Sequence, residues 1–408
     1  MSSSADEHEL RAWIRLGLEP GLGAARIRDL LAVFGMPQDV YAASTGSLAR
    51  HLDPDLAARM RQPPDEATAA AIDATLAWLR EPGHRLLTLA DPDYPARLLE
   101  LHDPPPMLYL NGRPELLHRP AIAVVGARSA TAGGLDNARA FARYLAQRGW
   151  CIVSGLASGI DAAAHEGALE AGPEGGGTIA VLGTGIDIVY PARNRALAHR
   201  AAQDGLLVSE FPLGARALPF FFPMRNRIVA ALSRGVLVVE AARQSGSLIT
   251  ARLASELGRE VFAIPGSIHS PLSRGCHALI RQGAKLVESG EDILEELRQS
   301  GLWRTPAPGG SGPEPTAPGA GGTPDAGAAP RLAPTQAHAP PRGSDAGVPP
   351  GSDADTLLRA LGHDPVDVDT LLLRTRWDVA RLNVQIGMLE VSGAIERQAD
   401  GRFLRVGT

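Results

Sequence analysis

The chain of 408 residues is too long for one ordinary domain, and its 44 % hydrophobic and 21 % charged residues are typical of a globular protein. Its two cysteines, Cys151 and Cys276, cannot build a disulfide framework or a CxxC metal pair, which favours a reducing compartment. The sequence has no apolar signal segment and no apolar run of the roughly 20 residues that a membrane span needs, so we expect a soluble cytoplasmic protein with no membrane partner.

Positive charge is concentrated in one stretch. The net charge of −5 argues against a polyanionic partner, yet residues 193–235 contain seven arginines and two acidic residues, a local excess of five positive charges. Lys285 is the only lysine, for which a genome biased toward arginine codons is the simpler explanation. Arginine is nevertheless the side chain suited to bidentate phosphate contacts and to stacking on bases.

Residues 1–80 are predicted to form a small helical domain. Apolar spacing indicates short helices within 10–18, within 19–35 and from Ala67 to Leu79. Between the first two, Pro20-Gly21-Leu22-Gly23 resembles a helix-hairpin-helix turn, whose amides can approach a phosphate backbone. A plain packing corner between two helices is the alternative, and the sequence leaves it open.

Residues 81–300 alternate between short apolar runs and amphipathic helical stretches. Helices are expected at 135–148, 160–171, 248–258 and 292–299. Continuous apolar strands joined by crossover helices indicate a doubly wound α/β domain, with a mostly parallel sheet covered on both faces. The strand candidates are 85–89, 121–126, 151–155, 178–183, 206–211, 235–241, 260–266 and 284–289.

The last quarter of the chain is predicted to hold a linker and a third domain. Residues 301–352 are dominated by Pro, Gly, Ala, Ser and Thr, a composition that predicts a disordered tether. In 353–408, three helical runs and two short β runs around Asp400-Gly401 indicate a winged helix-turn-helix. This piece has nine acidic residues and seven arginines, which favours protein docking or autoregulation over groove reading.

Small residues gather in the loops that leave the predicted strands. Ligands of doubly wound sheets bind beyond the carboxyl ends of the strands, where glycine lets backbone amides point at an anion. One such turn can be a mere packing requirement, but five or six on one edge favour phosphate binding. The loops are VVGARSATAGG (124–134), VSGLASGIDAAAH (153–165), VLGTGID (181–187), SEFPLG (209–214), VEAARQSGSLIT (239–250) and AIPGSIHSPLSRG (263–275).

The stretch FFFPMRNRIVAALS, residues 220–233, carries dense positive charge. If FFP ends a loop and a helix begins at Arg225, then Arg225, Asn226 and Arg227 occupy its first turn, where cations oppose the helix dipole. A bound polyanion would offset that cost. A neighbouring carboxylate, Glu210 or Glu240, is the alternative partner for one of the arginines.

Other chemistries lack their motifs. The sequence contains no complete GxGxxG after a strand, no Walker A, no HExxH and no GxSxG. His165 is expected to cap or pack its helix rather than to bind a metal, and Asp161 is either a catalytic carboxylate or a first-turn helix acid. We therefore predict no catalytic residue, no metal and no cofactor.

Several motifs in fixed order resemble the DNA-processing protein DprA (Smf) family. The resemblance covers essentially the whole predicted α/β region from Asp91 onward, the N-terminal helices look like that family's SAM-like domain, and the C-terminal piece resembles the winged helix of some members. The motifs are VGARxxT (125–131), VSGLASGIDAAAH (153–165), TIAVLGTGIDIVYPARN (178–194), VSEFPLG (208–214), FPMRNRIVAALS (222–233), VVEAARQSGSLITARLA (238–254), VFAIPG (261–266) and GCHALIRQGA (275–284).

The resemblance implies an extended Rossmann-like domain that binds and protects single-stranded DNA, forms a homodimer and helps to load the RecA recombinase in natural transformation, without catalysis. The DNA-contacting arginine of the family's VGSR motif falls on Arg128, with Ala127 in place of the usual serine. The tyrosine–glycine pair usual a few residues later reads Gly133-Gly134, so an aromatic contact from that loop is not expected. The DNA-binding residues predicted in this way are Gly126, Arg128, Ser154, Gly155, Gly159, Arg193, Asn194, Arg225, Asn226, Arg227, Gly246 and Ser247.

The sequence also leaves alternatives open. A phosphoribohydrolase-like enzyme on a related fold would carry PGGxGT followed by a glutamate, where this chain has PGSIHSPLSRG at 265–275. A transcription factor that uses the winged helix would need sequence-selective duplex binding by 353–408. For Phe220, Phe221 and Phe222, limited stacking on bases competes with burial in the core, and we expect phosphate contacts and a salt-sensitive affinity to dominate.

Overall fold

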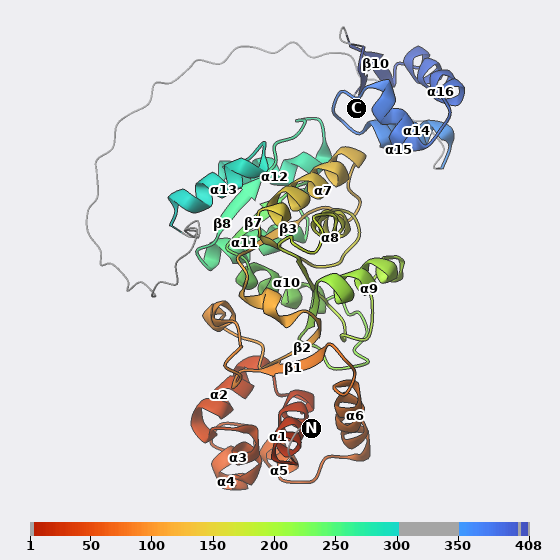
Figure 1. Ribbon diagram of the computed structural model, residues 1–408. Coiled ribbons are helices and arrows are strands. Elements are labelled where there is room, and N and C mark those ends of the chain that lie inside the picture. The colour runs from red at the N-terminus through yellow and green to blue at the C-terminus, as the bar shows by residue number, and fades with distance from the viewer. Residues whose placement is uncertain (1–3, 302–350, 399–400, 407–408) are drawn as a thin grey trace, which may run out of the picture.

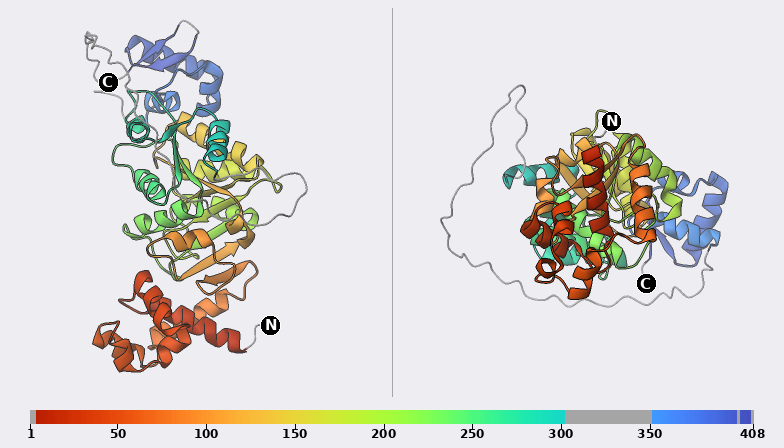
Figure 2. Two further views of the ribbon diagram at one scale, coloured as in Figure 1. Left: turned by 90° about the vertical axis from the view of Figure 1, so that its left-hand side faces the viewer. Right: turned by 90° about the horizontal axis from the view of Figure 1, so that it is seen from below.

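The computed structural model describes residues 4–301, 351–398 and 401–406. A helical region and a winged helix lie at opposite ends of the molecule, with a large sheet and its covering helices between them (Figures 1 and 2). The greater part of the predicted linker, 302–350, lies outside the described residues. Among the described helices, none is both long and apolar enough to cross a membrane.

Six helices form the N-terminal region. Helices α1 to α5 enclose a core that includes Leu16, Ile27 and Val40, while α1 and α6 also pack against the sheet through Trp13 and Ile72. The sequence predicts α1, α2 and α6. It misses the three short helices α3 to α5, which begin after local caps: Ser44 accepts from the Ser47 amide and Asp53 from the Asp55 amide. The bounds are α1 (Ser4–Leu18), α2 (Ala24–Phe34), α3 (Pro37–Ala42), α4 (Thr45–Leu48), α5 (Pro54–Met60) and α6 (Glu66–Trp78).

A nine-stranded sheet occupies the middle of the molecule, in the order β1-β2-β6-β5-β4-β3-β7-β8-β9. From β6 to β9 all neighbours are parallel, while β1 and β2 extend the sheet antiparallel beyond β6. The mostly parallel, doubly wound α/β fold is therefore confirmed, and β2 is a strand that the sequence candidates omit. The bounds are β1 (His84–Thr88), β2 (Met107–Gly112), β3 (Ala121–Val125), β4 (Cys151–Ser154), β5 (Thr178–Val181), β6 (Leu206–Ser209), β7 (Gly235–Val238), β8 (Glu260–Ala263) and β9 (Lys285–Leu286).

Helices cover both faces of this sheet because its central strands are apolar on both sides. In β3, Ala121, Ala123 and Val125 face one core, with α10 to α12, whereas Ile122 and Val124 face the other, with α7, α8 and α13. Short 3-10 turns η1 (Ala96–Glu100), η2 (Pro114–His118), η3 (Ala192–Asn194) and η4 (Pro271–Ser273) lie in the connections. The helices are α7 (Ala132–Gln147), α8 (Ile160–Glu170), α9 (Arg195–Asp204), α10 (Phe221–Leu232), α11 (Ser247–Glu256), α12 (Arg274–Arg281) and α13 (Gly290–Gln299).

The start of α10 corrects one sequence-based expectation. The helix begins at Phe221 and not at Arg225, so Phe222 and Pro223 form its first turn and both arginines lie further in. Proline fits there because the first amides of a helix have no intrahelical acceptor. The helix dipole therefore gives no reason to expect a bound anion at these two arginines. The role of each arginine follows from its own contacts.

The C-terminal piece is a winged helix, as predicted. Leu357, Leu371, Ile386 and Phe403 belong to its separate core. It lies against the N-terminal part of α7, where the Arg374 guanidinium pairs with Asp136 at 3.0 Å. The elements are α14 (Asp353–Leu361), α15 (Val368–Thr375), α16 (Val379–Val391), β10 (Ile395–Arg397) and β11 (Phe403–Arg405).

Candidate nucleic-acid interface

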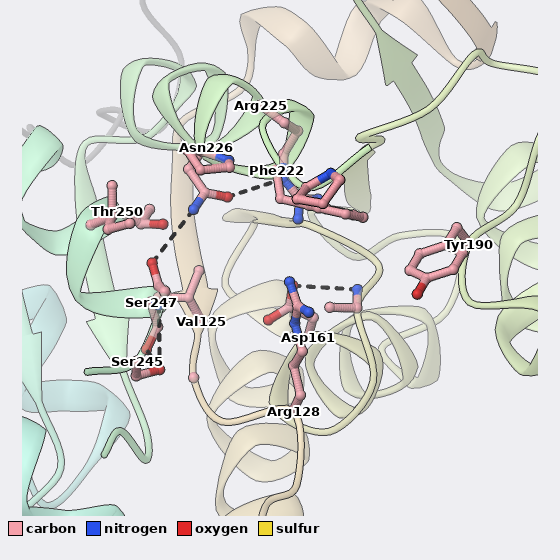
Figure 3. A pocket seen from close by; sticks show the side chains of 16 residues that line it. Val125, Arg128, Asp161, Tyr190, Phe222, Arg225, Asn226, Ser245, Ser247 and Thr250 are labelled. Atoms are coloured by element: carbon pink, nitrogen blue, oxygen red, sulfur yellow. Dashed lines mark hydrogen bonds between the residues drawn. The ribbon is translucent and has the colours of Figure 1, made fainter. Parts of the chain in front are cut away.

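Loops from five strands, β3 to β7, meet at the point where the strand order of the sheet reverses. The chain runs from β3 through β4 and β5 to β6 on one side, and then from β7 to β9 on the other side of β3. Doubly wound proteins bind ligands at such a switch point. A hollow of 620 Å³ lies here, and a smaller one of 180 Å³ shares five of its lining residues. We call the two together the switch-point trough, of which Figure 3 shows the larger hollow; their shared residues are Arg128, Ala157, Tyr190, Phe222 and Arg225.

Arg128 and Arg193 are the exposed cations of the trough. Arg128 follows β3, and its guanidinium carbon lies 5.2 Å from the centre of the Phe222 ring. Arg193 comes from the loop after β5, where its Nε donates to the Ser158 hydroxyl at 2.9 Å. No carboxylate in the described part of the chain forms an ion pair with either one. Both side chains are therefore free to pair with an anion from outside.

Arg225 has a different environment, because it is only 4 % exposed. Its Nη1 donates to the carbonyl oxygens of Gly155 and Val181, and its Nε donates to Asn226 Oδ1 at 3.1 Å. Burial lowers the pKa of Arg225 to about 10, while the charge of Asp161 opposes that shift. Arg225 is thus a buried strut of the trough that adds positive potential beneath it.

Asp161 holds the same loop from the other side. Its Oδ2 accepts from the Gly155 amide at 3.1 Å and from the Ala157 amide at 3.4 Å. Burial raises the pKa of Asp161, and the positive charges of Arg225 and Arg128 act in the opposite direction. Arg225 and Asp161 together fix the loop after β4: Arg225 bonds the Gly155 carbonyl and ties it to Val181 of β5, while Asp161 bonds the Gly155 and Ala157 amides.

Three predicted contact residues face inward. The Ser154 hydroxyl donates to Val124 O at 2.6 Å, and Asn194 Nδ2 donates to Leu156 O at 2.9 Å. Arg227 is paired with Glu210 at 2.7 Å and with Asp103 at 3.0 Å, so Glu210 is the carboxylate partner left open by the sequence. For all three the structure favours a supporting role over direct contact with a ligand.

Glu240 anchors the loop that carries Arg128. Its carboxylate accepts from the Thr131 amide at 2.9 Å and from the Thr131 hydroxyl at 2.6 Å. A Cβ atom at Gly134 would overlap this carboxylate, which explains glycine in the first turn of α7. Glu240 is therefore a partner of the loop and not of the arginines.

The glycines of the trough let its loops approach each other. A Cβ atom at Gly126 would lie 2.6 Å from Ile160 Cγ1, and Gly155 is covered by the Arg225 guanidinium. Gly159 has a φ of +75°, and a Cβ there would overlap the carbonyl oxygens of Ala127 and Arg128. At Gly246 the requirement is absent, since a Cβ atom would meet open space.

The far wall of the trough joins α10 to α11. Asn226 Nδ2 lies 3.5 Å from the carbonyl oxygen of Gly246, the residue before α11. Ser247 is nearly buried, with its hydroxyl 2.7 Å from that of Ser245. Figure 3 shows these side chains facing Arg128 across the hollow. Asn226, Gly246 and Ser247 therefore line the trough, and their contact with DNA stays a prediction.

Tyr190 is a trough residue that the sequence reasoning missed. It is 51 % exposed, and its ring centre lies 5.7 Å from that of Phe222. The motif YPARN contains this tyrosine, but the predicted contacts from that motif are only Arg193 and Asn194. Two aromatic faces beside two free guanidinium groups can stack bases and hold phosphates at once.

His165 packs below the trough, as expected. It is fully buried, with Nδ1 2.7 Å from the Thr178 hydroxyl, and burial lowers its pKa to about 3. Since Thr178 Oγ1 donates to Ile152 O, the network assigns the proton to His165 Nδ1. Among the described residues, no group of three or more His, Cys, Asp and Glu side chains could hold a metal ion.

The fold and the site define a doubly wound α/β protein with a cationic, aromatic ligand trough at its switch point. Comparison with protein families gives the particular family. The model for "DNA recombination-mediator protein A" matches residues 85–298, and the model for the "DprA winged helix domain" matches 336–401. The chain belongs to the DNA recombination-mediator protein A (DprA, Smf) family.

Individual relatives agree with this assignment. The chain is 49 % identical over 210 residues to "DNA processing protein DprA" of Streptococcus pneumoniae, covering 52 % of this chain and 73 % of that protein. It is 48 % identical over 239 residues to "Protein Smf" of Escherichia coli, covering 58 % of this chain but only 63 % of the relative. The crystal structure of the Streptococcus pneumoniae DprA superimposes with a TM-score of 0.61 and 38 % identity, covering 72 % of this chain and 98 % of that one.

Proposed function

We propose that this protein is a non-enzymatic single-stranded DNA-binding recombination mediator, which protects incoming DNA and helps to load the RecA recombinase in natural transformation. The observation that carries the proposal is the meeting of Arg128, Arg193 and Phe222 in one trough formed by the loops that leave the strands. Guanidinium groups hold phosphates without regard to sequence, and exposed rings are accessible only to unpaired bases. Membership of the recombination-mediator family supports the same function.

The polar groups of the trough support binding rather than catalysis. Asp161, its buried carboxylate, is occupied by the Gly155 and Ala157 amides, an arrangement that holds a loop and does not activate a nucleophile. The phosphoribohydrolase alternative gains no observation from this geometry. We expect no release of free base when the protein is incubated with nucleoside monophosphates.

The direct test is fluorescence anisotropy with a labelled oligonucleotide, single-stranded or annealed to its complement. We expect preference for the single strand and a loss of roughly tenfold or more in affinity for Arg128→Ala and for Arg193→Ala. Arg113→Ala is the matched control, since Arg113 lies beside Gly205 at the opposite edge of the sheet. Equal affinities of the wild type and both trough variants would contradict the proposal.

The recombination role is tested separately. RecA displaces a single-strand-binding protein from DNA slowly, so a mediator should shorten the lag before strand exchange. We expect the full chain, acting as a cytoplasmic homodimer, to shorten that lag and Arg128→Ala to leave it unchanged. A full effect of the Arg128 variant would separate recombinase loading from the trough.

A further inference from the structure

A second large hollow lies on the other side of the start of α10. It has a volume of 730 Å³ and is lined by the α1–α2 turn, by β2 and by the segment that follows β6. From α10 and the residue before it, Phe220, Phe221 and Met224 contribute to its wall. We call this hollow the turn groove, since Gly21, Leu22 and Gly23 of the α1–α2 turn form its opposite wall.

The turn groove and the switch-point trough share one ridge, residues 219–224. Pro219, Phe222 and Pro223 line the trough, whereas Phe220, Phe221 and Met224 line the turn groove. Neighbouring residues of one helical turn thus face two hollows. A polymer that leaves the trough across this ridge enters the turn groove directly.

Phe220 is presented to solvent on a rigid support. It is 58 % exposed, and its ring centre lies 4.7 Å from that of Phe221, which in turn stacks on Phe211 at 4.0 Å. Met224 beside it is 40 % exposed. An exposed ring that other rings hold in place loses little freedom when a base stacks on it.

The floor and the rim of the turn groove differ in charge. Its two acids are internally paired: Glu210 with Arg227 at 2.7 Å, and Glu19 with Arg15 at 3.5 Å. The floor is therefore close to neutral and apolar. At the rim, arginines flank the turn.

These rim arginines contact the turn through its carbonyl groups. Arg26 Nη1 donates to Gly21 O at 3.3 Å, and Arg59 Nη2 donates to Pro20 O at 2.6 Å. Both side chains are exposed. An apolar floor with a cationic rim matches a single strand, whose bases are apolar on their faces and whose backbone is anionic.

We propose that the turn groove is a second subsite for unpaired DNA, in which bases stack on Phe220 beside Met224 while the backbone follows Arg26 and Arg59. This proposal rests on the proposed function. It assigns the N-terminal helical region a direct part in binding, through the helix-hairpin-helix-like turn. It also predicts that the binding site of one protomer extends beyond the trough.

The test uses the full chain and oligothymidylates of about six and about eighteen nucleotides, of which only the longer can cross the ridge. Phe220→Ala should weaken binding of the longer strand roughly tenfold and leave the shorter unchanged. Phe220→Trp should retain affinity, and its added tryptophan fluorescence should be quenched by the longer strand only. Val33→Ala, which removes another exposed apolar side chain, should bind as wild type does.

The outcomes separate this proposal from the one on which it rests. If Arg128→Ala weakens both lengths while Phe220→Ala matches the wild type at both, the turn groove is not a DNA subsite and the trough still is. The same conclusion follows if an apolar peptide changes the tryptophan fluorescence of Phe220→Trp and the longer strand does not. If neither Arg128→Ala nor Phe220→Ala changes binding, the proposed function itself fails.

Discussion

At the scale of single residues, the arginines predicted to contact DNA have three different roles. Arg128 and Arg193 are exposed beside aromatic or hydroxyl groups, Arg225 is buried on backbone carbonyls, and Arg227 is neutralised by Glu210 and Asp103. The number of these charges can be counted in the sequence, but the solvent exposure of each arginine cannot be predicted from it. Exposure depends on where a helix begins, and α10 begins four residues before Arg225.

The first residue-scale prediction contrasts Arg128 with Arg225. Arg225→Ala would leave two buried carbonyls without donors and remove the nearby positive charge that favours the ionised form of buried Asp161, so we expect a loss of about 3–5 kcal/mol in the free energy of unfolding. Arg128→Ala should change that free energy by less than about 0.5 kcal/mol. Urea unfolding of both variants measures the difference. Equal stabilities would refute the role of Arg225 as a strut.

The second residue-scale prediction concerns His165. Because its pKa is about 3 in the folded protein and about 6.5 in an unfolded chain, the unfolded state binds a proton first as pH falls. The contribution of neutral His165 to the free energy of unfolding is therefore fully present above about pH 6.5. Its partial loss should lower the free energy of unfolding by about 2 kcal/mol at about pH 5. The non-titrating His165→Asn should show a shallower decline between pH 7 and pH 5. An unchanged slope would mean that His165 is not held neutral.

At the scale of elements, glycines set the spacing of the loops that form the trough. Gly159, in the left-handed region, lies against the carbonyl oxygens of Ala127 and Arg128. We expect Gly159→Ala to displace the Arg128 loop and to weaken single-strand binding at least about tenfold, even where the protein remains folded. Gly387→Ala in α16 is the control, because a Cβ atom there meets nothing within 4 Å and the residue does not line the trough. Anisotropy titration with both variants measures the effect, and a Gly159 variant that binds normally would contradict it.

The elements that sequence predicts well are those with a strong apolar pattern. The central strands are continuous apolar runs, and the glycine-rich loops after them do converge on one edge. The elements that it misses are set by other signals. Helices α3 to α5 depend on local caps, which an apolar pattern does not reveal. Strand β2 depends on pairing with β1 and β6, and these contacts lie outside any short window of sequence around β2.

The candidate site shows the same limit. The loop positions of Arg128, Arg193 and Gly246 follow from strand ends, so a sequence pattern can place them. Tyr190 and Phe222 form a pair only after the loop behind β5 has folded against α10, which no periodicity encodes. Ser154, Asn194 and Arg227 point inward for reasons of packing that are equally invisible in sequence.

At the scale of the whole molecule, the winged helix has a core of its own, whereas one core cluster joins the N-terminal helices to the sheet and includes Trp13, Ile72 and Tyr109. The winged helix contacts α7 through Arg374 and Asp136, and its Gly362 lies beside Thr131 of the loop that carries Arg128. None of its described residues lines the trough itself. We expect removal of 351–408 to change single-strand affinity by less than about threefold, since this piece has more acids than arginines. A large loss in anisotropy titration would place part of the DNA site on the winged helix.

The measurement that tests the central claim most directly is the salt dependence of single-strand affinity. Each phosphate contact adds about 0.7 to the magnitude of the slope of log affinity against log salt concentration. We predict that replacing both Arg128 and Arg193 by alanine lowers the magnitude of this slope by about 1.4, whereas Arg113→Ala leaves the slope unchanged. A slope that the double variant does not alter would show that the switch-point trough does not hold the phosphate backbone.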